Sequence, residues 1–122
     1  MTTQTPNGFI PLTHKSQMDY VLLNCPSNQL VVFYFTYPYC SPCNSILSRL
    51  SQWTTLFPTI NFYHINLDQN TKSHIAASFI SSCPTIQVFQ DYIDINTFIS
   101  MRTSSNPNDY EYDFNLLLEE RV

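Results

Sequence analysis

The feature that most constrains the fold is a run of apolar residues at 30–36 that leads into a pair of cysteines. The run, LVVFYFT, is rich in β-branched and aromatic residues and does not alternate with charged ones. Such a composition is typical of a strand that is buried on both faces. After the cysteines, apolar residues recur at three- and four-residue spacing, at Ile46, Leu47, Leu50 and Trp53. The pattern predicts a buried strand followed by a helix whose first turn holds Cys40 and Cys43.

Cys40 is predicted to be a reactive thiol because of its place at the start of this helix. Unpaired backbone N–H groups and the positive end of the helix dipole favour the thiolate over the thiol. Cys43 follows one turn later, where its sulfur can close a disulfide with Cys40. Pro42 suits the first turn, where its missing N–H has no partner within the helix. The spacing therefore predicts a redox-active dithiol.

A zinc site is the main alternative for a pair of cysteines with this spacing. Structural zinc needs two further ligands, which usually come as a second pair of Cys or His at short spacing. The other cysteines, Cys25 and Cys83, stand alone in the sequence, and the three histidines are scattered. We therefore expect no metal and no other bound cofactor.

Length and charge restrict the classes of protein further. The 122 residues suit one domain, and the formal net charge of −4, with a pI near 5.0, argues against nucleic acid or an anionic membrane as partner. The N-terminus lacks the basic and apolar regions of a secretory signal, and no run of about 18 apolar residues predicts a membrane span. We expect a cytoplasmic protein, in which cysteines serve chemistry or packing.

The other apolar patterns predict an α/β fold. Residues 1–13 resemble a loosely ordered arm, and the cysteine-bearing helix should end near Pro58. We further expect helices at 15–24, 71–79 and 109–121, a strand at 60–67, and a hairpin of strands at 85–90 and 93–101. The long crossover makes the strands at 30–36 and 60–67 parallel. Their carboxyl ends then share the edge of the sheet where Cys40 lies, which is where α/β proteins place their sites.

Three segments in this order resemble the thioredoxin family. They are YCSPC at 39–43, NLDQN at 66–70 and PTIQVF at 84–89, and the resemblance extends over residues 15–121. It implies a single thioredoxin-like domain whose central mixed β-sheet, with parallel and antiparallel strands, is flanked by helices. It also implies a protein-disulfide reductase in which Cys40 attacks a substrate disulfide and Cys43 resolves the mixed disulfide.

The resemblance also implies a substrate surface and partners. Cys83 and Pro84 would form a cis peptide facing Cys40, against which an extended substrate segment binds. Tyr39, Pro42 and Tyr37 would complete an apolar surface around the sulfur, although ordinary core packing is an alternative for the tyrosines. The implied partners are disulfide-containing proteins and an electron donor like thioredoxin reductase.

Several residues depart from the family pattern near the cysteines. Tyr34 stands where thioredoxins have a buried Asp, His64 replaces the Lys that partners it, Thr36 replaces a Trp, and Ser41 replaces a Gly. Because tyrosine, with a pKa near 10, is a poor base, we hypothesise a proton relay from Cys43 to His64 through the Tyr34 hydroxyl or a water. The alternative is that Tyr34 fills core volume and His64 is bonded to backbone.

The sequence allows more than one role for Cys25, for Cys83 and for the protein as a whole. Cys25 is most simply interpreted as a small buried apolar residue, and Cys83 either does the same or forms an alternative disulfide with Cys40 or a third metal ligand. The alternative to an enzyme is an interaction module of the same fold, which would bind a partner protein or a metal cluster through its cysteines without redox turnover.

Overall fold

The strand predicted from residues 30–36 is the centre of the sheet. In the computed structural model, which describes residues 4–24, 30–37, 40–73, 85–90, 100–102, 108–109, 111–112 and 114–115, β2 (Leu30–Thr36) is buried along its whole length. It pairs in parallel with β3 (Asn61–Asn66) and antiparallel with β4 (Thr85–Gln90). The predicted bounds of β2 and β4 are confirmed, as is the parallel pairing of β2 with β3.

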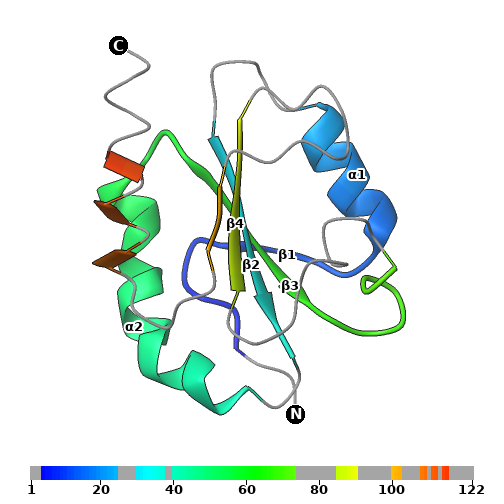
Figure 1. The fold of residues 1–122 in the computed structure, drawn as a ribbon, viewed down its shortest axis with the longest axis horizontal. Helices are drawn as coiled ribbons and strands as arrows, with labels where there is room; N and C mark the ends of the chain where they lie inside the picture. Colours follow the sequence, from blue (N-terminus) through cyan, green and yellow to red (C-terminus); the bar gives the residue numbers. More distant parts are fainter. Residues whose placement is uncertain are drawn as a thin grey trace.

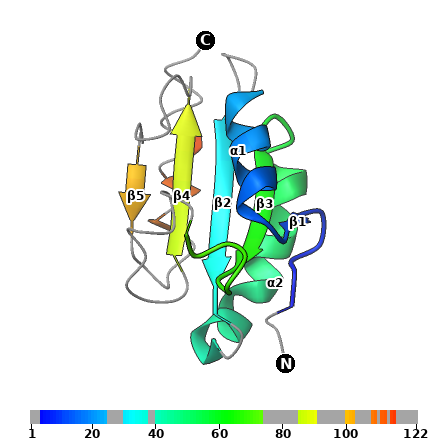
Figure 2. The same cartoon turned by 90° about the vertical axis from the view of Figure 1, so that its right-hand side faces the viewer.

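The described residues form a sheet of five strands in the order β1-β3-β2-β4-β5. The short edge strands are β1 (Ile10–Leu12), parallel to β3, and β5 (Ser100–Arg102), antiparallel to β4. Figure 2 shows β4 and β5 as the antiparallel side of the sheet and β2 and β3 as its parallel side. The predicted mixed α/β sheet is therefore confirmed.

Two helices cover opposite faces of this sheet (Figure 1). They are α1 (Lys15–Leu23) and α2 (Ser41–Leu56), close to the predicted bounds. Because side chains alternate along a strand, β2 contributes side chains to two separate hydrophobic cores. Val32 and Tyr34 join the α2 side, whereas Phe33 and Phe35 join the α1 side with Met18. Among the described helices, none is long and apolar enough to cross a membrane.

The prediction of a loosely ordered arm at 1–13 is wrong for residues 9–12. Phe9 is buried and stacks on Phe62, with ring centroids 5.0 Å apart, and β1 follows it immediately. The sequence pattern does not show this strand because Pro11 interrupts a short apolar run, which weakens the signal of a strand. The physical cause of its order is burial of the aromatic ring, which anchors the segment beside β3.

Gly8, the only glycine of the sequence, makes the turn that brings this segment against α2. Its φ is +83°, in the left-handed region, and a Cβ there would lie 2.5 Å from Thr54 Oγ1. The same turn places the Asn7 N–H 3.2 Å from Ser51 Oγ, as a hydrogen-bond donor. A larger residue at position 8 would be strained and would collide with α2.

Residues 108–115 attach to α2 through polar and aromatic contacts. The described residues of this segment are helical, in line with the predicted helix at 109–121. Arg49 forms an ion pair with Glu111, whose Oε2 also accepts a hydrogen bond of 3.1 Å from Trp53 Nε1. Phe114 packs edge-on against Trp53, with ring centroids 5.0 Å apart. The segment thereby closes the core on the α2 side.

Several predictions fall partly or wholly outside the described residues. Of the helix expected at 71–79, residues 71–73 form a turn, and the rest cannot be compared. The first strand of the hairpin is β4, and only the end of the second, as β5, is described. Cys25, Tyr39, Cys83, Pro84 and the side chain of Pro42 also lie outside the described part.

Candidate active site

The predicted cysteine pair lies between the end of β2 and the first turn of α2. Cys40 and Cys43 form a disulfide with an S–S distance of 2.05 Å and a Cα–Cα distance of 5.3 Å. Helix α2 begins at Ser41, and the Cys43 N–H donates a 3.2 Å hydrogen bond to the Cys40 carbonyl. Both cysteines are buried, but Cys40 keeps 4% of its surface exposed whereas Cys43 keeps none. Cys40 is therefore the sulfur of the pair nearer to solvent.

The helix explains why this position suits thiol chemistry. Cys40 precedes a helix of 16 residues, so the N–H groups of the first turn and the positive end of the helix dipole lie beside its sulfur. A negative charge on sulfur is stabilised there relative to solution. When the disulfide opens, Cys40 is the thiol that this geometry favours as a thiolate.

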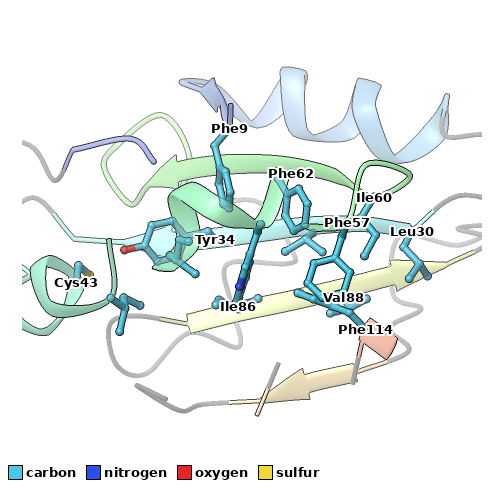
Figure 3. Packing of buried hydrophobic residues seen from close by; sticks show 14 of the residues in the cluster. Phe9, Leu30, Tyr34, Cys43, Phe57, Ile60, Phe62, Ile86, Val88 and Phe114 are labelled. Carbon is cyan, nitrogen blue, oxygen red and sulfur yellow. The ribbon is translucent and has the colours of Figure 1, made fainter. Parts of the chain in front are cut away.

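Tyr34 and His64, predicted together from the family pattern, are neighbours across β2 and β3. Their rings stack with centroids 5.1 Å apart and planes 27° apart. Phe9 packs edge-on against the Tyr34 ring, at 6.1 Å and 87°. Figure 3 shows the Tyr34 hydroxyl at the end of the ring that points toward Cys43. The tyrosine is fully buried in the same apolar cluster as both cysteines.

His64 lies in a buried chain of hydrogen bonds. Its Nδ1 is 2.8 Å from Thr5 Oγ1, and its Nε2 is 2.8 Å from Thr36 Oγ1. Thr36 in turn donates its hydroxyl hydrogen to Asn66 Oδ1 at 2.6 Å. Thr36 must therefore accept from His64 Nε2–H, which leaves Nδ1 to accept from the Thr5 hydroxyl. The ring is held in one neutral tautomer.

This arrangement argues against His64 as the end of a proton relay. Burial lowers the pKa of His64 from 6.5 to about 4, because the charged imidazolium would lose its hydration. Both ring nitrogens already bond threonine hydroxyls. The alternative expected a bond to backbone, and here the structure differs too, since the partners of the histidine are side chains. Through these hydrogen bonds, His64 connects β3 to β2 and to the N-terminal segment.

Sequence reasoning misses part of this chain of hydrogen bonds. Thr36 stands out in the sequence only as a replacement for a family Trp, and Asn66 only as part of a motif. Thr5 carries no signal at all, because it meets His64 across 59 positions of sequence. Thr36 and Asn66 are register partners on β2 and β3, whereas only the fold of residues 4–9 brings Thr5 to His64.

A cavity of about 360 Å³ opens at the carboxyl ends of β1 and β3, beside this chain. It is lined by Gln4, Thr5, Pro11, Leu12, Thr13, His64, Asn66 and Asp68. Among the residues that the structure describes, no group of three His, Cys, Asp or Glu side chains could hold a metal ion. The cavity is a separate feature from the cysteine pair, which does not line it.

Of the predicted contact residues around the sulfur, Tyr37 alone has a described side chain. It directly follows β2 and is 39% exposed. The contributions of Tyr39, Pro42, Cys83 and Pro84 stay predictions.

The fold and the cysteine pair together define a class of protein: a mixed sheet with helices on both faces, and a dithiol at the start of the helix that leaves the central strand. The Thioredoxin family model matches residues 10–107. This chain belongs to the thioredoxin family.

Relatives of known sequence are thioredoxins of modest identity. The chain is 26% identical over 86 residues to the mitochondrial thioredoxin O2 of Arabidopsis thaliana, across 69% of this chain and 54% of that protein. It is 29% identical over 79 residues to thioredoxin of Geodia cydonium, across 65% of this chain and 73% of that one. The match thus spans only about half the length of the Arabidopsis protein.

Solved structures share the fold at lower identity. Thioredoxin f2 of Chlamydomonas reinhardtii aligns with a TM-score of 0.77 and 20% identity over 89% of this chain and 95% of that one. A chain from the complex of ferredoxin:thioredoxin reductase and thioredoxin f2 aligns with a TM-score of 0.77 and 14% identity, over 88% and 93%.

Proposed function

We propose that this protein is a thiol–disulfide oxidoreductase that reduces disulfides in other proteins. The observation that carries the proposal is the Cys40–Cys43 disulfide at the start of α2 in a chain of the thioredoxin family. Geometry favours Cys40 as the nucleophile, because it has the helix N-terminus beside it and is the more exposed sulfur. Cys43, one turn deeper, is the resolving cysteine.

The reaction then has two exchange steps. The Cys40 thiolate attacks one sulfur of the substrate disulfide, forming a mixed disulfide and releasing the other substrate sulfur as a thiolate. Cys43 loses its proton and attacks the Cys40 sulfur, which forms the Cys40–Cys43 disulfide and releases the second substrate thiolate. The substrate gains two electrons and the cysteine pair loses two. No cofactor takes part in either step.

The remaining partners and the compartment are part of the same proposal. Turnover requires a donor that reduces the Cys40–Cys43 disulfide again, and a solved thioredoxin f2 of this fold forms a complex with ferredoxin:thioredoxin reductase. We place substrate contact at Tyr39, Pro42, Cys83 and Pro84, by their match to the family motifs. A cytoplasmic location fits a protein-disulfide reductase, which needs a compartment that keeps thiols reduced.

Insulin reduction by dithiothreitol tests the proposal. Wild-type protein should speed precipitation of the insulin B chain well beyond dithiothreitol alone, and Cys40→Ser should abolish the acceleration. Cys43→Ser should instead accumulate a mixed disulfide on Cys40, detectable by mass spectrometry, because the resolving thiol is gone. Cys25→Ser, the same chemical change outside the pair, should leave the rate unchanged.

Wild-type protein that accelerates nothing in this assay would contradict the proposal. If such inert protein also carried zinc or iron on metal analysis, the interaction module expected as the alternative would replace it.

A further inference from the structure

Tyr34 is held in one place beneath the cysteine pair. Its ring contacts two aromatic neighbours: it stacks on His64 at 5.1 Å and meets Phe9 edge-on at 6.1 Å. The hydroxyl points toward Cys43 (Figure 3), and the whole side chain is buried. A ring that is fully buried among close-packed neighbours has few other orientations, so the hydroxyl is held toward Cys43.

The surroundings decide what this hydroxyl can do. Cys43 is fully buried in an apolar cluster that includes Ile46 and Ile86. Such surroundings disfavour a thiolate unless a hydrogen-bond donor compensates for the lost water. His64, the titratable group facing Tyr34 from β3, uses both ring nitrogens on threonines and is neutral at pH 7. Tyr34 is a polar side chain whose hydroxyl points toward Cys43 (Figure 3).

We propose that, when the disulfide is open, the Tyr34 hydroxyl donates a hydrogen bond to the Cys43 sulfur and stabilises the thiolate that attacks the mixed disulfide. The inference rests on the proposed function and adds Tyr34 to the reaction as a hydrogen-bond donor. The phenol keeps its proton and acts only as a hydrogen-bond donor. Hydrogen bonds to a charged acceptor are stronger than those between neutral groups, and stronger again away from water.

The step balances without a base in the protein. The proton of Cys43 leaves to water or to the departing substrate thiolate, and the Cys43 sulfur then bonds the Cys40 sulfur. The bond between Cys40 and the substrate sulfur breaks, so Cys43 is oxidised and the substrate sulfur is reduced. Tyr34 donates a hydrogen bond throughout and transfers no proton.

The decisive experiment measures the pKa of Cys43 directly and needs no turnover. In a Cys40→Ala background, alkylation of the Cys43 peptide is followed by mass spectrometry from pH 6 to pH 11, with and without Tyr34→Phe. Loss of one charge-assisted hydrogen bond should raise the pKa of Cys43 by about one unit. Tyr63→Phe is the matched control, because Tyr63 lies on β3 and packs on the α1 side of the sheet. A pKa of Cys43 that is the same with and without Tyr34→Phe would overturn the proposal.

Stopped-flow kinetics gives the second test. Tenfold less thiolate, partly offset by the higher nucleophilicity of a more basic sulfur, should slow resolution in Tyr34→Phe by about threefold at neutral pH. Attack by Cys40 should be unchanged. Slower resolution in His64→Gln with a normal rate in Tyr34→Phe would overturn the proposal in favour of a relay. If wild-type Cys40 attacks no disulfide, the proposed function fails, while the Cys43 titration still decides the role of Tyr34.

Thermal unfolding checks that Tyr34→Phe is folded. Should that variant be unfolded, Tyr34→Met keeps an apolar side chain of similar reach without a donor. The same rise in the pKa of Cys43 is expected from it, and no rise would again overturn the proposal.

Discussion

Burial of His64 should make this protein sensitive to acid. Its pKa is about 4 in the folded chain and about 6.5 in the unfolded chain. Between these values only the unfolded chain binds the proton, so the free energy of unfolding falls as pH drops from about 6.5 to about 4. The full loss is about 3 kcal/mol. Urea unfolding at pH 7 and pH 4.5 should show a smaller decrease for His64→Gln than for wild type.

His14→Gln is the matched control for this prediction, because His14 is exposed. It should retain the acid sensitivity of the wild type. A decrease in stability that is the same in wild type and His64→Gln would show that another group is responsible.

Gly8→Ala should be costly, although it adds one methyl group. The backbone at position 8 has a φ of +83°, and the new Cβ would meet the side chain of Thr54. Strained backbone of this kind costs about 1–3 kcal/mol, and the collision adds to it. Thermal unfolding should show a lower midpoint for Gly8→Ala, with part of the loss recovered in a Thr54→Ala background. Unchanged stability in Gly8→Ala would mean that the turn is made differently.

At the scale of elements, the attachment of residues 108–115 to α2 should depend on charge. Hydrogen bonds from Arg49 hold the pKa of Glu111 below its usual range. The ionised carboxylate therefore contributes stability above its unfolded pKa, and this contribution disappears as pH falls through the lower folded value. Glu111→Gln should lower the urea midpoint at pH 7, and the difference from wild type should shrink as pH falls below the usual pKa range of a glutamate.

A double-mutant cycle with Arg49→Gln checks that the effect belongs to this pair. In that background, Glu111→Gln should change the midpoint little at either pH. A full effect without Arg49 would attribute the role of Glu111 to its hydrogen bond from Trp53 instead.

The elements that sequence predicts well are those whose own residues determine their burial. β2 is apolar at nearly every position because both of its faces are covered, and α2 shows its apolar spacing clearly. β1 is not predicted, because it is short, contains Pro11 and is ordered by the packing of Phe9 on Phe62. Local pattern carries little information on contacts of that kind.

The candidate site likewise has features that the sequence predicts and features that depend on distant residues. The disulfide between Cys40 and Cys43 follows from spacing on a helix, and the pairing of Tyr34 with His64 follows from two aligned strands. The hydrogen bond from Thr5 and the low pKa of His64 depend on burial by distant residues. These tertiary effects make His64 a weaker proton acceptor than its sequence position suggests.

In the whole molecule, the cysteine pair, the hydrogen-bond chain of His64 and the cavity lie at one edge of the sheet. The carboxyl ends of three parallel strands meet there: β2 leads to Cys40, β3 ends at Asn66, and β1 ends at Leu12 beside the cavity. The face of the sheet under α1 holds apolar packing instead. The cysteine pair, the hydrogen-bond chain of His64 and the cavity therefore lie on the same side of the domain as Tyr37.

The position of Trp53 has a consequence for optical measurements. It is the only tryptophan of the sequence, and it lies ten residues beyond Cys43, about 15 Å along the helix axis. Its indole contacts Phe114 and Glu111. Intrinsic fluorescence is therefore a local probe of how residues 108–115 sit on α2. An emission change would signal release of that segment, whereas the oxidation state of the cysteines has to be followed by a thiol-specific reagent.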